Sequence, residues 1–397
     1  MFKHLFKLIW NKKKQNALLI TEMLVSFMVM FAVFSMAVNV YRNYKIPMGF
    51  EYENVWVINL ANSPKFKTAD SSVTYYRNVR NTLMSMPQVM EVSYSSSNTP
   101  FTGSFMSTGY KYKGKQFNNI SYYQVDNYYK KAFNLQLLEG RWFNKEDDAA
   151  AYRPVVINQS FKQEIFGNDA AVGKNLDDYD GKTDQKRNKI VGVVADLKDH
   201  GDFKPTDRGI YSRADSGFYK WMSRIIVKVA PSADAAFEGR LYKTTAGMMK
   251  QAVIDIEHFT KKRDAMNKEN LTPIIITTIL AAFLIINVAL GLFGVLWYNI
   301  NKRRGEIGLR RAVGASGNSV SWQIVAESMV LATLSLILGV FFAVQFPLLN
   351  LFDLSTGVYV NAIVLSVIFI YLLVFICSLY PGKQAAAIYP AVALHEE

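Results

Sequence analysis

Residues 272–301 read TPIIITTILAAFLIINVALGLFGVLWYNIN and contain no charged residue. A membrane-spanning helix needs about 20 predominantly apolar residues, and soluble helices rarely stay apolar on every face over such a length. Three further runs share this character: residues 17–38, with Glu22 as the only charge, residues 312–352, with Glu327 as the only charge, and residues 354–382, with none. We predict transmembrane helices near 17–40, 272–299, 321–346 and 359–381.

The composition excludes several classes of protein. Half of the 397 residues are hydrophobic, which excludes a disordered chain because so much apolar surface needs burial. A single cysteine, Cys377, excludes a disulfide-built domain, and its place in the fourth apolar run favours a small apolar filler. The net charge of +13 could suggest nucleic acid, but its cytoplasmic part borders the membrane, where lipid headgroups and topology account for it better.

The distribution of basic residues predicts the orientation in the membrane. Residues 1–16 carry five lysines and no acid, and residues 301–320 carry one lysine and four arginines against Glu306 alone, whereas residues 347–358 carry no basic residue. We therefore expect both termini and the 301–320 loop in the cytoplasm, and residues 41–271 outside it. The first run is too long for the apolar part of a signal peptide, and no A-x-A-like site follows it, so we expect a retained helix.

The region between the first two helices contains two segments with the same order of elements. Each has a β-rich run, a helical stretch and a second β-rich run: residues 55–60, 71–86 and 89–95 in one, and 224–229, 234–250 and 252–256 in the other. Both are typical of βαβ units, and two such units would bury their helices against one four-stranded sheet. Between them we predict an inserted subdomain, residues 100–222, with strands at 120–125, 154–157 and 190–194, a helix at 159–166 and a mobile loop at 177–189.

The sequence thus predicts a membrane protein with four transmembrane α-helices plus a large α/β (α+β) extracytoplasmic domain of two subdomains inserted between helices 1 and 2. Residues 256–271 are polar with a helical pattern, and we expect them to continue helix 2 outward as a stalk. Residues 39–45 would match them after helix 1.

No motif for covalent chemistry or nucleotide binding is present. Residues 167–174, GNDAAVGK, approach a Walker A motif, but five residues separate the glycines and Asn175 follows where Ser or Thr should supply a magnesium ligand. The sequence has no nucleophile–base signature. We therefore expect no catalytic residue, no cofactor and no metal in this chain. The histidines, which have no metal-ligand spacing, are His4, His200, His258 and His395.

The most distinctive stretch of the cytoplasmic loop is RRGEIGLRRAVGAS, residues 303–316. A short amphipathic helix fits it, with Ile307, Leu309 and Val313 toward the membrane and the arginines outward. Taken alone, the stretch is explained by a positively charged loop that fixes the topology.

The same stretch closely resembles the R-x-x-E-I-G-x-x-R-A-x-G-A signature of FtsX-like permeases, the MacB branch of ABC transporters. Residues 322–340, WQIVAESMVLATLSLILGV, resemble the third helix of that family. Residues 380–394, YPGKQAAAIYPAVAL, resemble its C-terminal ending, with Gly382 and Lys383 where Ala-Arg is usual. Residues 137–143, 155–176 and 189–196 resemble its periplasmic core. The signature residues in this chain are Arg303, Glu306, Ile307, Gly308, Arg311, Ala312, Gly314 and Ala315.

This resemblance implies a non-catalytic transmembrane subunit of an ATP-driven transporter in the bacterial inner membrane. Two such subunits, identical or related, pair, and each docks a cytoplasmic ABC ATPase, which binds ATP and magnesium, through the 301–320 loop. The ATPase moves the helices, and the stalk transmits the motion to the periplasmic domain, a mode called mechanotransmission. MacB carries its ATPase on the same chain, whereas about 16 residues precede helix 1 here, so we expect a separate ATPase chain.

The resemblance also assigns the parts of the chain. The βαβ subdomain, residues 46–99 and 223–258, is porter-like, and the inserted subdomain, residues 100–222, is sabre-like. The remaining parts are the basic N-terminal segment 1–16, helix 1 with its stalk 17–45, the stalk and helix 2 259–300, the coupling loop 301–320, helix 3 321–346, the outside loop 347–358, helix 4 359–381 and the cytoplasmic tail 382–397.

Two acids lie inside apolar runs, where a charge costs about 2.5–3.5 kcal/mol on insertion scales and usually faces a partner. We expect Glu327 to pair with basic residues of the coupling loop or with the N-terminal lysines, the alternative being a side chain that extends toward the headgroups. For Glu22, one turn into helix 1, that alternative is at least as well supported.

The coupling loop also carries expected roles. Arg310 and Arg311 would meet acidic residues of the ATPase, because the planar guanidinium binds carboxylates in a fixed geometry. Gly308 and Gly314 would allow a close backbone approach or a turn. In helix 2, Gly291 and Gly294 would let helices pack closely, although ordinary membrane composition explains them equally well.

Three functions stay open within this class. The resemblance favours efflux or export in a MacB-like tripartite pump, with a periplasmic adaptor, an outer-membrane duct and membrane lipids as partners, and no nucleic acid. The alternatives are a lipoprotein-releasing permease and an FtsX-like regulator of cell-wall hydrolases, whose outside domain is generally smaller. A sensor would need a cytoplasmic output domain, and the longest predicted cytoplasmic stretch is too short to fold alone. The substrate does not follow from the sequence.

Overall fold

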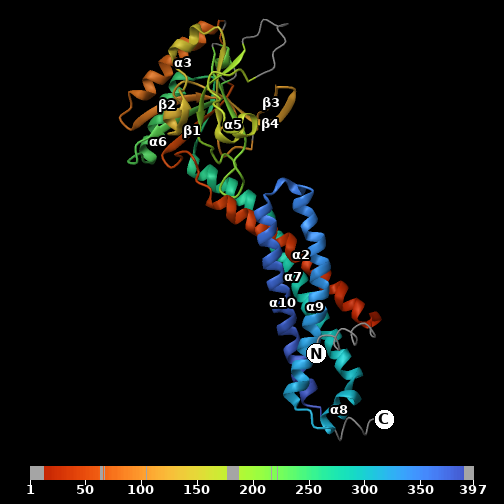
Figure 1. The fold of residues 1–397 in the computed structure, drawn as a ribbon. Helices are drawn as coiled ribbons and strands as arrows, with labels where there is room; N and C mark the ends of the chain where they lie inside the picture. The colour runs from red at the N-terminus through yellow and green to blue at the C-terminus, as the bar shows by residue number, and fades with distance from the viewer. Residues whose placement is uncertain are drawn as a thin grey trace. The chain divides into compact units, whose positions relative to one another are not determined.

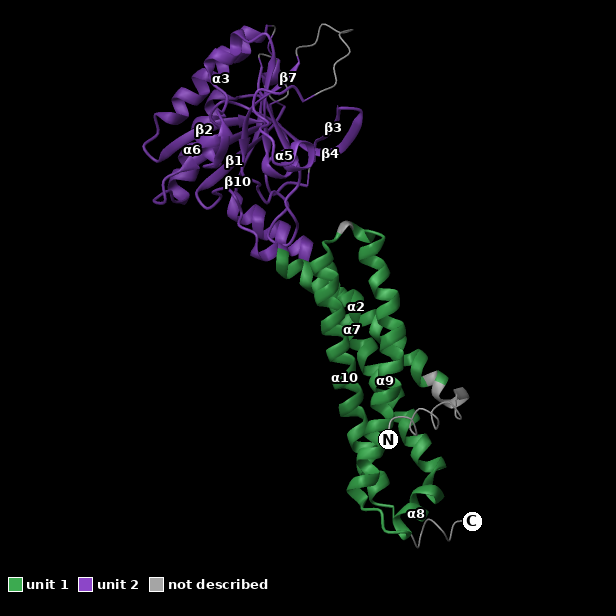
Figure 2. Cartoon of the chain, in the orientation of Figure 1, with its two compact units in different colours: residues 1–42, 272–397 green, residues 43–271 purple. Residues whose placement is uncertain are grey.

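The computed structural model describes residues 13–62, 66, 68–103, 105–176, 187–215, 217–220 and 222–388. The chain divides into two compact units (Figure 2). One, which we call the helical unit, consists of residues 1–42 and 272–397. The other, the head domain, consists of residues 43–271.

Four long helices build the helical unit (Figure 1). Within the described residues, these four are long and apolar enough to cross a membrane. The predicted fold class, a membrane protein with an α/β domain between its first and second spans, is confirmed. The helices are α2 (Lys13–Lys45), α7 (Phe259–Lys302), α9 (Gly317–Leu348) and α10 (Thr356–Ala386).

Helices α2, α7 and α10 extend beyond the apolar runs from which they were predicted, whereas α9 lies within its run. Residues 259–271 contain neither Gly nor Pro and carry three lysines, and they continue α7 on its N-terminal side. Residues 41–45 continue α2 in the same way on its C-terminal side. The polar stretches expected to form a stalk are therefore uninterrupted parts of the two helices. A short turn, η3 (Leu351–Asp353), lies between α9 and α10.

Small residues let α2 pack closely on α9. A side chain at Gly339 would clash with the ring of Phe27, and the Ser335 hydroxyl donates to the carbonyl of Ile20 at 3.0 Å. Between membrane helices the driving force is close van der Waals contact and hydrogen bonding, for which small residues leave the space. Phe27 is accordingly part of the buried core shared by the four helices.

The head domain contains one mixed sheet of ten strands in the order β10-β1-β9-β2-β4-β8-β6-β7-β5, with β3 paired to β4. The strands are β1 (Val55–Ala61), β2 (Val89–Ser95), β3 (Ser107–Tyr112), β4 (Lys115–Val125), β5 (Leu137–Gly140), β6 (Arg153–Asn158), β7 (Asn188–Val194), β8 (Gly209–Arg213), β9 (Arg224–Val229) and β10 (Val253–His258). The helices and turns are α3 (Ala69–Met84), α4 (Tyr129–Ala132), η1 (Lys145–Ala149), α5 (Gln159–Phe166), η2 (Phe218–Lys220) and α6 (Ala235–Met248).

The two predicted βαβ units interlock in the first half of this sheet. Strand β9 of the second unit lies between β1 and β2 of the first, and all neighbours in β10-β1-β9-β2 are antiparallel. Helices α3 and α6 pack on one face, where Trp56 and Ile58 contribute to their core. The alternate residues Val55 and Val57 face the other core, which the inserted segment supplies.

The inserted segment continues the sheet through β4, β8, β6, β7 and β5. Its junction with the first half is narrow, because β2 and β4 share one register pair, Ser95 with Val125. Three strands, β3, β5 and β8, had not been predicted. Strand β3 has no buried face, β5 is only four residues long, and β8 follows a polar loop. Part of the predicted mobile loop, 177–186, lies outside the described residues. Its end was assigned wrongly, because Asn188 and Lys189 begin β7.

Candidate functional site

A short helix, α8 (Arg304–Ala312), occupies the loop between α7 and α9. Arg303 separates α7 from α8 with non-helical backbone angles. After α8, Gly314 has a φ of +103°, a conformation that residues with a side chain rarely adopt, so the expected turn at this glycine is present. The hydroxyl of Ser316 then accepts from the backbone N–H of Ser319 at 3.2 Å and caps α9.

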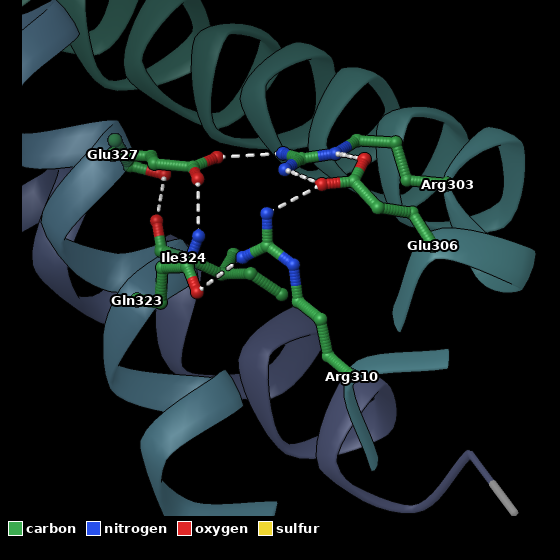
Figure 3. A network of polar contacts seen from close by, with 7 residues as sticks. Arg303, Glu306, Arg310, Gln323, Ile324 and Glu327 are labelled. Carbon is green, nitrogen blue, oxygen red and sulfur yellow. Dashed lines mark hydrogen bonds and ion pairs between the residues drawn. The ribbon is translucent and has the colours of Figure 1, made fainter. Parts of the chain in front are cut away.

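Arg303 joins α8 to the acid inside the third membrane helix (Figure 3). Its Nη1 donates to Oε2 of Glu327 at 2.7 Å, and its Nε donates to Oε2 of Glu306 at 3.1 Å. The structure thus pairs Glu327 with a basic residue of the coupling loop, which is the first of the two arrangements expected from the sequence. The N-terminal lysine side chains lie outside the described residues.

Two further side chains close a ring of contacts, which we call the α8 ring (Figure 3). Arg310 donates through Nη2 to Oε1 of Glu306 at 2.7 Å and through Nη1 to Oε1 of Gln323 at 2.8 Å. Gln323 donates through Nε2 to Oε1 of Glu327 at 3.0 Å, one helical turn further along α9. Gln323 was not among the residues expected from the sequence, although its spacing of four residues from Glu327 was the available signal.

The α8 ring balances its charges, with two arginines and two glutamates around one neutral amide. Such balance matters because a half-buried carboxylate without a partner is costly, and more so within a membrane helix. Burial acts to lower the pKa of Arg303, but its hydrogen bonds to Glu306 and Glu327 have the larger combined effect, so its pKa is raised. Arg303 therefore stays cationic and keeps Glu327 paired.

An apolar cluster lies beneath the α8 ring and corrects one expectation. Ile307 is buried against Ile300 of α7, with Val320, Ile324 and Ala385 completing the cluster. Leu309 and Val313, by contrast, are 56% and 83% exposed. Ile307 and Leu309 are two residues apart, about 200° around a helix, and cannot share a face as the sequence analysis expected. The exposed face of α8 is instead the Leu309 side.

Arg311 and Gly308 also face the protein. A Cβ added at Gly317 would lie 2.8 Å from Nη1 of Arg311 and 3.0 Å from the carbonyl oxygen of Ala386, so the guanidinium lies beside the last turn of α10. A cation is favoured there by the helix dipole. Gly308 is buried in α8. The expectation that Arg310 and Arg311 point outward is therefore not met, since both guanidinium groups lie against groups of this chain.

The second intramembrane acid, Glu22, lies against a glycine of α7. A Cβ at Gly291 would clash with its carboxylate, whereas the same test at Gly294 finds open space. Close approach of the helices is thus specific to Gly291. The structure brings Glu22 and Gly291 together, apart from the α8 ring.

Comparisons with known proteins agree with this architecture. Residues 18–241 match the MacB-like periplasmic core domain, and residues 278–390 match the FtsX-like permease C-terminal domain. The macrolide export ATP-binding/permease protein MacB of Bdellovibrio bacteriovorus is 23% identical over 273 residues, which cover 65% of this chain and 41% of that protein. The uncharacterized ABC transporter permease YvrN of Bacillus subtilis is 22% identical over 300 residues, covering 70% and 71%.

Among solved structures, the periplasmic region of MacB from Actinobacillus actinomycetemcomitans matches with a TM-score of 0.38 and 18% identity, covering 54% of this chain and 92% of that one. The chain spans about two-fifths of the length of the MacB relatives that it matches. The core-domain match alone extends over more than half of the residues, and the permease match includes α8 and the whole α8 ring. The chain therefore belongs to the MacB-type permeases, ABC transporter proteins that combine a MacB-like periplasmic core domain with an FtsX-like permease domain.

Proposed function

We propose that the chain is a permease subunit that couples a cytoplasmic ATPase to movement of its head domain. One observation carries the proposal: the α8 ring fixes one side of α8 to α9, while the neighbouring face of α8, away from buried Ile307, exposes the apolar side chains of Leu309 and Val313. Because α8 is fixed relative to α9, a displacement of α8 by a bound partner would also displace α9, a membrane helix.

The exposed side of α8 has the pattern of a docking surface. Gly305, Leu309, Ala312 and Val313 are exposed, and their spacing of four, three and one residues places them on one face. Two large apolar side chains beside two small residues form a knob that fits a groove in a protein partner. The occupant that we propose is the ATPase, because the basic residues around this loop favour its cytoplasmic placement.

The proposed orientation follows from the number of spans. If all four helices cross the membrane, α8 lies on the same side as both termini, and the head domain lies on the other side. The basic residues around α8 favour the cytoplasm for the first side and the periplasm for the head domain. The host membrane is then the bacterial inner membrane, as the name of the matched core domain also suggests.

The proposed path to the head domain runs through α2 and α7. Both run as single helices across the boundary between the two units, although Pro273, which has no N–H to donate, lies in α7 where its apolar part begins. Within the head domain, buried Lys198 donates to the carbonyl of Asn43 near the end of α2. Four residues further along, Oδ2 of Asp202 accepts a hydrogen bond from Nη2 of Arg263 in α7 at 2.6 Å. One loop of the head domain thus holds both helices.

We further propose efflux or export as the task, with a second permease subunit, an adaptor and an outer-membrane duct as partners. The relatives named for macrolide export support this choice. In that assembly, residues 46–99 and 223–258 would act as the porter-like part and residues 100–222 as the sabre-like part. The chain itself would bind no ATP and perform no catalysis.

The test is a pull-down of the full-length tagged chain in mild detergent, with mass spectrometry of the proteins recovered. Wild type is compared with Leu309→Glu/Val313→Glu, which places two carboxylates on the exposed face of α8. A matched control, Val253→Glu, adds a carboxylate at a 63% exposed valine of the head domain. We expect wild type and Val253→Glu to recover an ATPase, and the α8 variant to recover little of it while inserting into the membrane normally.

The recovered partners decide the task. An ATPase with an adaptor and a duct supports efflux, whereas an ATPase with a lipid carrier or lipoproteins indicates lipoprotein release. A cell-wall hydrolase with the ATPase indicates a regulator. Absence of any ATPase, or equal recovery with the α8 variant, would contradict the coupling role of α8.

A further inference from the structure

A loop of the head domain, residues 196–207, carries a group of side chains that the proposed function does not use. We call this segment the clasp loop. Asp199, His200 and Asp207 each offer one oxygen or nitrogen atom that could bind a metal, and these three atoms lie within 4.8 Å of one another. The histidine spacing in the sequence had predicted no metal ligand, because two of the three groups are carboxylates and one of them lies seven residues away.

The distances within this group are close to those of a metal site. Nε2 of His200 lies 2.7 Å from Oδ2 of Asp207 and 3.6 Å from Oδ1 of Asp199. Two ligands of a tetrahedral zinc ion with bonds near 2.0–2.1 Å are separated by about 3.3 Å. The observed separations lie on either side of this value, so small side-chain rotations bring the three atoms into a zinc coordination sphere.

One of the three ligand atoms lacks a hydrogen bond. Asp199 is 4% exposed, and its Oδ1 is buried without a hydrogen-bond partner among the described residues. Its other oxygen, Oδ2, accepts the hydroxyl of buried Tyr123, which fixes the rotation of the carboxylate and aims Oδ1 at His200. A buried carboxylate oxygen in this condition calls for a positive charge.

The backbone holds each ligand residue in place. The carbonyl of Asp199 accepts from the N–H of Phe101, that of His200 from the amide of Asn270, and that of Asp207 from the amide of Asn158, each at 2.7 Å. Phe105 packs edge-on against the imidazole with 4.4 Å between ring centroids. Three anchors from three other parts of the head domain preorganise the group, as metal sites require. The residues that supply these anchors are Phe101, Asn158 and Asn270.

We propose that Asp199, His200 and Asp207 bind a zinc ion, with water as the fourth ligand. One imidazole and two carboxylates suit zinc, because calcium and magnesium prefer all-oxygen sites and copper(I) prefers thiolates or thioethers. Asp207 has a 42% exposed side chain, so the ion has a path from solvent. Tyr123 is the residue behind Asp199 that orients it.

The position of this site gives it a mechanical consequence. The same clasp loop places Lys198 on the carbonyl of Asn43 and Asp202 on Arg263, so it holds the ends of α2 and α7 that lie in the head domain. A zinc ion bridging residues 199, 200 and 207 would close the loop on itself. We expect it to slow local opening of the clasp loop and to raise the melting temperature of the head domain.

The test uses the full-length chain, purified in detergent with a tag that contains no histidine, loaded with zinc sulfate and dialysed against metal-free buffer. Zinc is measured by mass spectrometry of the metal and by competition with a chromophoric chelator. The variants are His200→Gln and Asp207→Asn, chosen because Asp207 is partly exposed and its loss should leave the fold intact. The matched control is Glu238→Gln, which removes the carboxylate of the other histidine–carboxylate pair in this domain, 2.9 Å from His258.

We expect wild type and Glu238→Gln to retain one zinc per chain and to melt at higher temperature with zinc than without it. His200→Gln and Asp207→Asn should lose the bound zinc and the zinc-dependent shift, while melting as single transitions. Zinc retained equally by all four proteins would place the ion elsewhere and overturn the proposal. So would a wild type that retains none, which would leave His200 as an imidazolium ion paired with two carboxylates.

Discussion

The two ends of α7 are both held by arginine–carboxylate pairs, but the two carboxylates differ in burial. At the end in the head domain, Arg263 donates to Asp202 at 3.0 and 2.6 Å, with side chains 28% and 9% exposed. At the end in the helical unit, Arg303 donates to Glu327 at 2.7 Å, with side chains 21% and 19% exposed. Each carboxylate also accepts from an amide, Asn267 in the first case and Gln323 in the second.

The comparison shows how one helix can be anchored twice with different strengths. Asp202 is the more buried of the two carboxylates, so water replaces its lost partners less readily than it does at Glu327. The head-domain anchor should therefore respond more strongly to substitution. A weaker response at the α8 anchor is what the proposed coupling to an ATPase would require.

The largest expected effect is at the head-domain anchor. Asp202→Ala removes the acceptor of both Arg263 and Asn267, but Arg263 is 28% exposed and can be partly hydrated, so we expect a loss of about 2–3 kcal/mol in the free energy of unfolding of the head domain. Denaturant unfolding of the full chain in detergent, followed by tryptophan fluorescence, measures it. The double variant with Arg263→Ala should lose less than the sum of the single losses; strict additivity would show that the pair is not coupled.

Asp126, a third buried acid, sharpens the comparison: its hydrogen bonds come from neutral groups, whereas Asp202 and Glu327 pair with arginines. Asp126 accepts from the hydroxyl of Ser93 at 2.6 Å and from the N–H of Tyr128 at 3.0 Å. Burial raises its pKa to about 6, against an ordinary value of 3.8. The folded state therefore binds this proton more tightly than the unfolded chain does. The stability that the proton lends is present below about pH 4 and is lost as the pH rises through about 6.

Asp126→Asn should remove this pH dependence, because an amide does not ionise and its oxygen can still accept both hydrogen bonds. At pH 7 we expect the variant to exceed wild type by up to about 3 kcal/mol in the free energy of unfolding, and to equal it near pH 4. Urea titrations at the two pH values provide the measurement. An unchanged slope between them would mean that other carboxylates dominate the acid response.

A smaller effect is expected at the α8 anchor. Glu327→Gln keeps a hydrogen-bond acceptor for Arg303 but removes the charge, so we expect a loss of about 1–2 kcal/mol in stability. Thermal unfolding in the same detergent measures the loss, and stimulation of the partner ATPase measures coupling. A larger loss than that of Asp202→Ala would reverse the order of the two anchors. Intact assembly and coupling would remove Glu327 from the proposed mechanism.

The smallest effect on stability belongs to the exposed face of α8. Leu309→Ser and Val313→Ser change side chains that contact little of this chain, so we expect the free energy of unfolding to stay within about 0.5 kcal/mol of wild type. Ile307→Ser, two residues from Leu309 on the buried face of α8, is the matched contrast and should cost several times more. Equal losses in all three variants would show that Leu309 and Val313 pack against the protein after all.

The sequence predicted the elements whose signal is local. Four apolar runs identified the four long helices, and alternation with short helical stretches identified β1, β2, β9 and β10. It did not predict that β9 inserts between β1 and β2, because strand order depends on long-range pairing. Strand β3 also escaped prediction, since its exposed alternation of polar residues lacks the apolar face by which a strand is recognised.

For the candidate site, the pairing of Glu327 with a basic residue could be predicted, because an acid within an apolar run usually has a partner of opposite charge. The direction of the Arg310 side chain could not be predicted, because several acceptors within reach of a long side chain compete; in the folded chain Gln323 and Glu306 accept its hydrogen bonds. The clasp-loop group was missed for a related reason. Carboxylates are too common in loops for their spacing to signal a metal without the fold that aligns them.

The register pair between Ser95 and Arg224 has a consequence for how this domain can be cut. The chain leaves the first half of the sheet after Ser95 and returns to it at Arg224, and these two residues are direct partners on the neighbouring strands β2 and β9. A turn of a few residues could therefore replace the 128 residues 96–223 and leave a closed hairpin. Yet Val57 and Ile226 of that sheet are buried in the same core as Tyr123 and Phe133 of the insertion. The connection of the chain would therefore allow the inserted segment to be deleted. The apolar residues of the sheet that the segment covers would then be exposed to solvent.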